Sequence, residues 1–346
     1  MSTISSHTGF QPLKEVWLGD SYPSHFFNQI KNTQLRDLCL MVNEITKEDL
    51  HKIQKTIESF GVKVCRPNFD SVDQYVDEYD NLIKPPITPR DWALVLDDTL
   101  YIIPQYISGV EPFQADIDRY QKHNQNVRVL NRFQANSEDW CWLTYPGVVR
   151  VGRDIFIDYN PNNLNQANAV KNIASALSKK YRVHLGITAD HSDGVFCPVS
   201  PGNIIATHYR THYSTGWPNW NVLNLPDSTR SKNNGFNGNW WVPGVDLCHF
   251  NDSMISSIQS WLGNSSETVF EVNMLVIDEK NVLVLAYDDY ICGALESIGL
   301  TPHVVNFRTR GFWDGGLHCL TLDIHRDGNC IDYWPDRGSV GIDYNF

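Results

Sequence analysis

Apolar and polar positions follow the same order several times along the chain: a β-hairpin, an amphipathic helix and a short strand. The copy nearest the C-terminus shows this order most clearly. Residues 272–278 alternate between apolar and polar, residues 279–281 are polar, and residues 282–286 form a second apolar run. Two β-rich runs around a polar turn predict a hairpin.

The same copy continues with a helix and a strand. Asp288 or Asp289 can accept hydrogen bonds from the first backbone N–H groups of the helix and so cap it. The apolar residues of the helix recur at i, i+4 and i+7, on one face: Ile291, Leu295 and Ile298. Gly299 favours a helix end, and residues 303–307 are expected to form the closing strand.

Other segments repeat this order upstream. Hairpins are predicted over 92–104, 148–157 and 194–207, with turns at 97–98, 152–154 and 201–203. Helices are predicted near 113–122 and over 164–177, and an N-terminal copy has a strand at 16–18 and a helix with Leu50, Ile53, Ile57 and Phe60. The closing strands, at 62–64, 127–130 and 181–187, begin about 55–65 residues apart, which is typical of a repeat architecture. Any α/β protein alternates strands and helices, but hairpin-helix-strand units disfavour a doubly wound parallel sheet.

Residues 209–250 interrupt the repeat. They contain Trp217, Trp220, Trp240 and Trp241 together with three prolines and many Asn and Gly residues. Loops longer than about 12–15 residues are often functional. A surface segment anchored by its own tryptophans explains the same pattern equally well.

Composition narrows the classes of function. The 346 residues include 28 Lys+Arg and 40 Asp+Glu, a formal net charge of −12, which argues against a nucleic-acid partner. The polar N-terminus does not resemble a signal peptide, and no apolar run approaches the roughly 18 residues of a membrane span. The eight cysteines form no C-x-x-C pair. We therefore expect reduced thiols, a cytoplasmic location and neither a metal nor an organic cofactor.

The densest candidate for chemistry lies near the C-terminus. Gly315 and Gly316 precede His318 and Cys319, which open a predicted strand over 320–324. Glycines let the backbone approach a ligand closely, and a cysteine at the start of a strand can be a nucleophile if a neighbour stabilises its thiolate. Most cysteines, however, are inert small apolar side chains.

Polar residues also mark the starts of the predicted hairpins. His191 and Asp193 can supply proton transfer and a carboxylate, or they can form a capped surface turn. Asp91 precedes the 92–104 hairpin. Arg210 follows the 194–207 hairpin, where its guanidinium can form a bidentate ion pair with a carboxylate or remain solvated. In a closed ring of repeats these strand ends would converge, so the clusters support each other.

With these residues in view, the chain resembles the amidinotransferases, a family of the guanidine-modifying pentein superfamily that includes glycine and inosamine-phosphate amidinotransferases. The resemblance runs from about Arg90 to Arg326 and rests on matches in order and spacing: 90–91, 152–156, 191–193, 201–202, Arg210, 273–280, 299–308 and 315–323. It implies an α/β propeller of five ββαβ-like modules around a pseudo-fivefold axis. The chain is then one domain over residues 1–346 with an insertion at about 209–250.

The resemblance also implies a reaction. Cys319 would attack the guanidinium carbon of L-arginine and release L-ornithine, and an amine acceptor would take the amidino group from the cysteine. His191 would transfer the protons, Asp91 and Asp193 would hold the guanidinium, and Arg210 would bind the substrate carboxylate. Small-molecule substrates would be the partners, with a homodimer left open.

The chain departs from the family pattern before residues 152–156. The family has an acid there that pairs with the catalytic histidine, whereas residues 142–147 contain none. Asp139, with Glu138 beside it, is the candidate for this role. The same site would also suit a hydrolase that uses water, a deiminase or dihydrolase, and the fold would also suit a non-catalytic binding protein.

Overall fold

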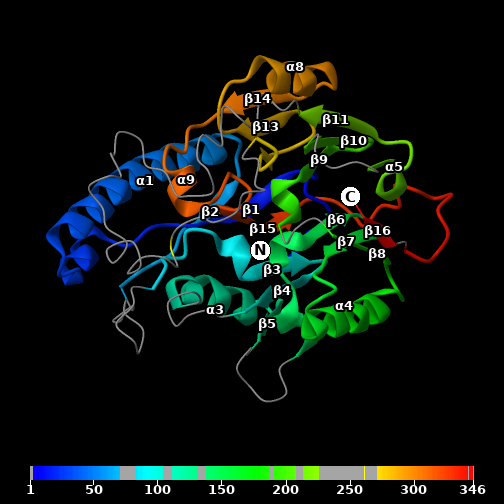
Figure 1. Cartoon of the computed structure of the whole chain (residues 1–346), viewed down its shortest axis with the longest axis horizontal. Coiled ribbons are helices and arrows are strands. Elements are labelled where there is room, and N and C mark those ends of the chain that lie inside the picture. Colours follow the sequence, from blue (N-terminus) through cyan, green and yellow to red (C-terminus); the bar gives the residue numbers. More distant parts are fainter. Residues whose placement is uncertain are drawn as a thin grey trace.

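Five small sheets surround the middle of the molecule, and helices lie outside them (Figure 1). The computed structural model describes residues 3–70, 83–103, 111–130, 138–187, 191–207, 213–225, 261, 271–341 and 343–345. Within these residues, the hairpin-helix-strand order predicted from the sequence corresponds to a small three-stranded sheet that recurs along the chain.

Each sheet contains an antiparallel hairpin and a third strand that runs parallel to the second strand of the hairpin. Four sheets follow chain order: β3 (Ala93–Leu96), β4 (Thr99–Ile102) and β5 (Asn126–Val129); β6 (Val148–Val151), β7 (Asp154–Asp158) and β8 (Arg182–Ile187); β9 (Phe196–Ser200), β10 (Asn203–Thr207) and β11 (Asn221–Leu225); β12 (Leu275–Val276), β13 (Asn281–Val284) and β14 (Thr301–Val304). A short C-terminal strand, β16 (Asp343–Asn345), adds to β8 in parallel.

The remaining sheet joins the two ends of the chain. Strand β1 (Leu13–Leu18) pairs antiparallel with β15 (Thr321–Arg326) and parallel with β2 (Lys63–Cys65). This sheet therefore has the same arrangement of strands as the other four, but its antiparallel pair comes from opposite ends of the sequence and is not a hairpin. Because β15 begins two residues after Cys319, the pairing holds the turn that carries the candidate nucleophile close to the end of the N-terminal strand.

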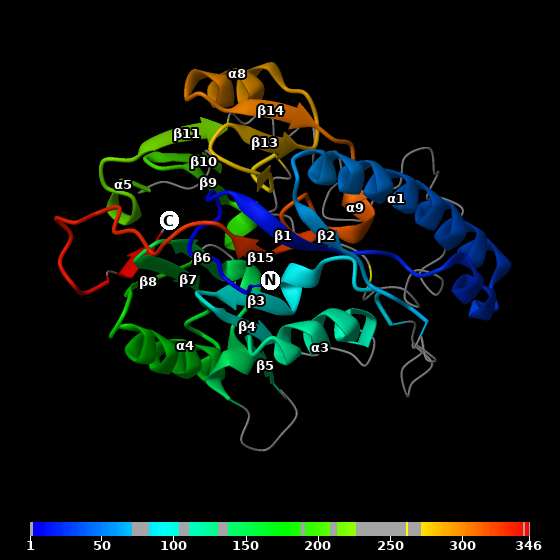
Figure 2. The same ribbon diagram turned by 180° about the vertical axis from the view of Figure 1, so that it is seen from behind.

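The longer helices lie on the outer side of the sheets in both views (Figures 1 and 2): α1 (Thr33–Ser59), α3 (Gln114–Lys122), α4 (Leu164–Leu177) and α8 (Asp289–Ser297). The shorter elements are the helices α5 (Tyr213–Gly216) and α9 (Arg310–Trp313) and the 3-10 turns η1 (Ser24–Gln29), η2 (Pro89–Asp91), η3 (Glu111–Phe113), η4 (Asp139–Trp142), η5 (Tyr145–Gly147) and η6 (Ser192–Gly194). Asp288 caps α8 as predicted, since its carboxylate accepts hydrogen bonds from the N–H groups of Tyr290 and Ile291. Of the helices within the described ranges, none combines enough length and apolar character to cross a membrane.

The hairpin strands are buried on both faces. In β3, Ala93 and Val95 belong to one apolar cluster with Trp17 of β1, whereas Leu94 belongs to another with Ile155 of β7. Successive residues of a strand point to opposite faces, so the hairpins β3–β4, β6–β7 and β12–β13 each contribute to two clusters. This explains why the hairpins are almost continuously apolar.

Four apolar clusters connect neighbouring sheets. The β15-β1-β2 sheet shares one cluster with β3–β5, and β3–β5 share the next with β6–β8. The sheets β6–β8, β9–β11 and β12–β14 share a third cluster. The fourth joins β12–β14 to β1, with α1 packed against it. The buried contacts therefore follow the chain from sheet to sheet and return to the first.

Most local predictions are confirmed. The hairpins turn at Asp97, Gly152 and Gly202, which have positive φ values of 60°, 63° and 81°. The last closing strand lies at Thr301–Val304 rather than at 303–307. Gly299, which has a positive φ of 85°, ends the preceding helix, and the strand begins two residues later. Within 209–250, the described elements are α5 and β11. β11 is the third strand of the β9–β10 sheet, and the sequence pattern did not predict it. The rest of that segment lies outside the described residues.

Candidate active site

Cys319 lies in a tight turn between α9 and β15 and is 3% exposed. The turn is held by a hydrogen bond from the N–H of Leu320 to the carbonyl of Gly316 (3.0 Å) and by one from the hydroxyl of Thr321 to the carbonyl of Leu317 (2.8 Å). Gly315 packs closely against this turn, since a Cβ at this position would lie 3.3 Å from the Cβ of Cys319. The sequence therefore places the thiol on a rigid support at the end of a central strand.

Asn273 holds Cys319 from the neighbouring module. Its Nδ2 donates to the Sγ of Cys319 (3.1 Å) and to the backbone carbonyl of Asp193 (3.1 Å), and its Oδ1 accepts from the N–H of Cys319 (3.0 Å). The side chain is fully buried. Asn273 is the first residue of the 273–280 match to the amidinotransferases. No local sequence pattern distinguishes it from an ordinary residue before a strand, so the sequence predicts no role for it.

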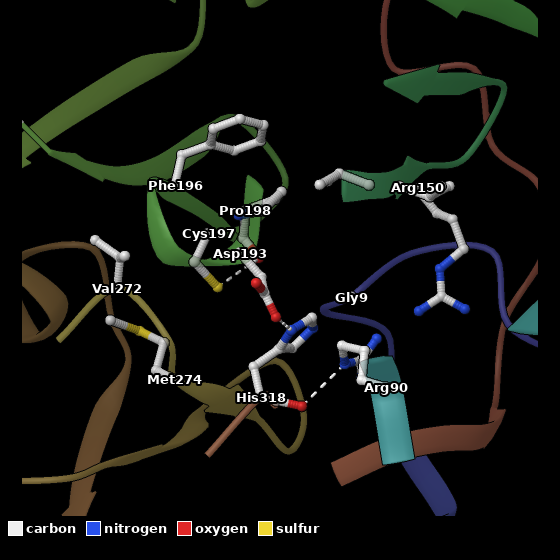
Figure 3. Close-up of a pocket in the computed structure, with 12 residues that line it drawn as sticks. Gly9, Arg90, Arg150, Asp193, Phe196, Cys197, Pro198, Val272, Met274 and His318 are labelled. Atoms are coloured by element: carbon white, nitrogen blue, oxygen red, sulfur yellow. Dashed lines mark hydrogen bonds and ion pairs between the residues drawn. The ribbon is translucent and has the colours of Figure 1, made fainter. Parts of the chain in front are cut away.

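Asp193 lies in η6, directly before the β9–β10 hairpin, and is 5% exposed. Its Oδ2 lies 2.8 Å from the Nδ1 of His318 and 3.6 Å from the Sγ of Cys319 (Figure 3 shows the contact with His318). Its Oδ1 is buried and has no hydrogen-bond partner among the described residues. Because a buried carboxylate oxygen normally has a donor, this atom is available to a ligand that carries N–H groups.

The charges of Asp193 and His318 follow from their surroundings. Burial favours the neutral form of Asp193, but the hydrogen bond from His318 and the charges of His318, His191 and Arg90 hold the pKa of Asp193 below its ordinary value. Burial and the nearby Arg90 guanidinium lower the pKa of His318. At neutral pH the site therefore contains a carboxylate and a neutral imidazole, whose Nδ1 carries the hydrogen that it donates to Asp193.

Cys319 is protonated in the empty site. Burial raises the pKa of its thiol well above the ordinary value, and the carboxylates of Asp193 and Asp91 raise it further, while the hydrogen bond from Asn273 acts in the opposite direction. A cation bound between these carboxylates would reverse their effect on the thiol.

Asp91 approaches the site from another module. It ends η2, and its Oδ2 accepts a hydrogen bond from the hydroxyl of Thr88 (2.6 Å). Thr88 in turn faces Gly315, where an added Cβ would lie 3.1 Å from the Thr88 methyl group. Its charge acts on Cys319. The charges of both carboxylates predicted as substrate ligands therefore act on the predicted nucleophile.

The other predicted site residues are placed less directly. His191 immediately precedes η6, its carbonyl accepts from the N–H of Gly194 (3.0 Å), and its charge acts on Asp193. Asp139 begins η4, which packs against α4, so its pairing with His191 stays a prediction. Arg210 lies outside the described residues.

A small cavity lies beside Asp193 and His318, at the centre of the sheets (Figure 3). Its volume of about 30 Å³ holds one or two water molecules rather than an amino acid. Arg90 and Arg150 line it, and both donate to Asp323 on β15, at 2.6 Å each. Arg90 also donates through Nε to the backbone carbonyls of His318 (2.9 Å) and Thr321 (3.0 Å), which fixes the turn that carries Cys319.

One group of side chains in the described residues has ligand atoms close enough for a metal ion. Glu15, Cys65 and Asp116 offer one atom each within 4.8 Å of one another. The Arg119 guanidinium already binds the two carboxylates, at 2.7 Å from Glu15 and 2.6 Å from Asp116. Its charge takes the place that a cation would occupy.

Known proteins with related sequences and folds are amidinotransferases. A mitochondrial glycine amidinotransferase from Xenopus tropicalis is 26% identical over 95% of this chain and 77% of its own length. The inosamine-phosphate amidinotransferase of Streptomyces griseus has the same fold, with a TM-score of 0.69, 18% identity, and coverage of 96% of this chain and 99% of that one. An amidinotransferase of saxitoxin biosynthesis from Microseira wollei gives a TM-score of 0.67 at 19% identity, covering 95% and 99% of the two chains.

The chain is therefore similar in sequence to glycine amidinotransferase and shares the fold of solved amidinotransferases. No family model matches it. The match to the chicken glycine amidinotransferase, 26% identical, spans 54% of this chain and 39% of the relative. A dimethylarginine dimethylaminohydrolase from Pseudomonas aeruginosa shares the fold more distantly, with a TM-score of 0.52 and 11% identity over 90% of this chain and 99% of that one. The fold of this chain is therefore shared by hydrolases as well as transferases.

Proposed function

We propose that the protein transfers the amidino group of L-arginine to an amine acceptor through a covalent amidino intermediate on Cys319. One observation carries the proposal. The Sγ of Cys319 lies 3.6 Å from the carboxylate of Asp193, whose other oxygen is buried without a hydrogen-bond partner among the described residues. A buried acceptor beside a buried thiol suits a guanidinium, which is planar, charged and rich in N–H donors.

The carboxylates would select and orient the substrate. Asp193 and Asp91 would accept hydrogen bonds from the guanidinium and hold its carbon over the Sγ of Cys319. The same charge would compensate the two carboxylates that raise the pKa of the thiol, so the thiolate would form when arginine binds. Arg210 is proposed to bind the substrate carboxylate.

In the first half-reaction, the thiolate of Cys319 adds to the guanidinium carbon. The bond from that carbon to the side-chain nitrogen of arginine then breaks, and His191 donates a proton to the departing nitrogen. Ornithine leaves, and a positively charged amidino group remains on the sulfur. Asp139 would hold the imidazole of His191 during this transfer.

In the second half-reaction, the amine acceptor attacks the amidino carbon and gives a proton to His191. The carbon–sulfur bond breaks, which restores the thiolate and releases a new guanidino compound. The relatives with similar sequences are named for glycine and for L-lysine as acceptors, so a primary amine is the expected class. Two half-reactions through one cysteine predict ping-pong kinetics.

Hydrolysis is the second candidate, and the fold shared with a dimethylarginine hydrolase favours it. There, ammonia would leave the guanidinium after attack by Cys319, and water would release citrulline. The described residues around Cys319 suit both reactions. The difference lies in what reaches the amidino group after the first product has left.

Incubation with arginine, with and without amine acceptors, separates these functions. Ornithine formed only in the presence of glycine, lysine or another amine supports transfer. Citrulline and ammonia formed without an amine would replace it with hydrolysis. A mass increase of one amidino group on the peptide containing Cys319, after brief exposure to arginine alone, would exclude a protein that only binds.

We also propose that the five sheets form a closed ring around a pseudo-fivefold axis. The equal arrangement of the sheets and the return of the apolar contacts to the first sheet support this. A ring brings strand ends from different modules to one place, which accounts for a site built from η2, η6 and the turn before β15.

A further inference from the structure

Asn273 links three parts of the site through one amide group. It precedes β12, yet it contacts Cys319 at the start of β15 and the backbone of Asp193 in η6. The backbone carbonyl of Asn273 also accepts from the N–H of His318 (3.3 Å). Side chain and backbone together thus fix the nucleophile, the carboxylate and the imidazole relative to one another.

The amide has little room to move. A Cβ at Gly316 would lie 2.6 Å from the Oδ1 of Asn273 and 2.7 Å from its Cβ, so only glycine fits opposite this side chain. Asn273 is 0% exposed and its Oδ1 and Nδ2 both have partners. A tightly packed, fully satisfied amide is rigid and keeps its donor aimed at one atom.

We propose that Asn273 is a positioning residue for amidino transfer, which holds the Sγ of Cys319 beside Asp193 and donates a hydrogen bond to the sulfur whenever it carries negative charge. This rests on the proposed role of Cys319 as nucleophile. The sulfur becomes anionic twice, before attack on arginine and when the amidino group leaves it. A hydrogen bond to a charged group is stronger than one to a neutral group, so the amide favours both of these states over the resting thiol.

The opposing influences on Cys319 show why this donor matters. Burial and two carboxylates raise the pKa of the thiol, and the side chain of Asn273 lowers it. Among the described residues it is the side-chain donor that contacts the sulfur. Without it, the substrate cation and the backbone hydrogen bond at Gly316 would be left to favour the thiolate.

The test measures Cys319 without using arginine. Alkylation by iodoacetamide, followed by mass analysis of the Cys319 peptide between pH 7 and 10, reports how readily the thiolate forms. Asn273→Ala is expected to slow alkylation about 10- to 100-fold at neutral pH, the range for one hydrogen bond to a charged group, and to move its pH profile upward. In turnover, kcat is expected to fall more than KM rises.

Asn273→Asp separates donation from shape. Aspartate has the same size and keeps an acceptor for the N–H of Cys319, but it replaces the donor with a negative oxygen. It is expected to slow alkylation more than Asn273→Ala does. If Asn273→Asp instead reacts like the unaltered protein, Asn273 only fills space and the proposal is wrong.

Matched variants control for packing. Asn43→Ala removes another buried asparagine, one on α1 that donates to Ser24, and is expected to leave the alkylation profile unchanged. Should Asn273→Ala fail to fold, Gly316→Ala displaces the same amide and is expected to slow alkylation, whereas Gly293→Ala, where nothing lies within 4 Å of the new Cβ, is not. An unchanged profile in folded Asn273→Ala, or in Gly316→Ala, overturns the proposal.

The two proposals can fail separately. A shifted alkylation profile in a protein that never transfers an amidino group would confirm that Asn273 stabilises the thiolate of Cys319 but would remove the proposed function. Amidino transfer with an unchanged profile in Asn273→Ala would do the reverse.

Discussion

Two buried aspartates near Cys319 are surrounded very differently. Asp323 on β15 accepts hydrogen bonds from Arg90 (2.6 Å), Arg150 (2.6 Å), Arg326 (3.0 Å) and Ser6 (2.9 Å), which occupy both of its oxygens. Asp193 has one imidazole partner and one oxygen without a partner among the described residues. Both carboxylates are almost fully buried.

The difference in their partners indicates a structural role for Asp323 and a ligand-binding role for Asp193. Burial favours a neutral Asp323, but the three guanidinium groups together hold its pKa well below the ordinary value. A carboxylate with this many partners stabilises the native state and has no capacity left for a substrate. Asp193 carries its charge with an incomplete set of partners, as expected of a group that gains its last partner when a ligand binds.

The largest expected effect removes the nucleophile. Cys319→Ala should lower amidino transfer at least about 10⁴-fold, because no other group can carry the amidino intermediate. The melting temperature should change little, since the side chain is small. Turnover and thermal unfolding of the same preparation check both expectations. Transfer that persists would remove Cys319 from the mechanism.

Asp323→Asn tests the structural side of the comparison. Loss of the negative charge leaves the guanidinium groups of Arg90, Arg150 and Arg326 buried without compensation, which should destabilise the protein by about 3–5 kcal/mol. Urea unfolding at neutral pH gives the change in the free energy of unfolding. Asp98→Asn, an exposed loop carboxylate, serves as the control. A loss similar to that of the control would mean that Asp323 is not a structural centre.

Asp193→Asn tests the binding side. The buried carboxylate is expected to contribute to arginine binding and not to folding, so kcat/KM for arginine should fall by about two to three orders of magnitude. The free energy of unfolding should change far less than in Asp323→Asn, because His318 loses only one neutral donor contact. Steady-state kinetics and urea unfolding distinguish the two outcomes. Equal loss of stability in both variants would erase the distinction between the two aspartates.

A smaller effect concerns pH. The pKa of His318 is lowered in the folded protein, so the unfolded chain takes up its proton first, at about pH 6.5. The stabilising contribution is therefore complete above that pH and is lost as pH falls toward the folded pKa. His318→Gln should lose less stability between pH 7.5 and 5.5 than the unaltered protein. His7, His184 and His325 have lowered pKa values too, so only part of the dependence should disappear. If both proteins lose the same stability between pH 7.5 and 5.5, the pKa of His318 is not lowered by folding.

The local features could be predicted because their causes lie close together in the sequence. Asp288 caps α8 because its carboxylate reaches the N–H groups two and three residues ahead. Gly152 and Gly202 mark hairpin turns because the backbone there has positive φ. The apolar face of α4 buries Ala167, Val170 and Ile173 in the order that helical spacing requires.

The candidate site was predictable only in part. Cys319, His191, Asp193 and Asp91 stand at the starts of hairpins or strands, and the resemblance to amidinotransferases marked them. Asn273 and His318 lie within the matched stretches but received no predicted role, since their significance depends on contacts with Asp193 and Cys319 across module boundaries. The roles of Asp139 and Arg210 stay predictions, which the experiments above do not depend on.

The sequence by itself determined the repeated unit, its turns and caps, and the residue types that the chemistry needs, because these follow from backbone preferences over a few neighbouring positions. Only the tertiary structure decided that β1 completes a hairpin with β15, and that Asn273 and Asp193 meet at Cys319. Contacts between distant segments depend on how whole sheets pack, and no local pattern encodes them. The same packing decided which buried aspartate is enclosed by arginines and which keeps an oxygen for a ligand.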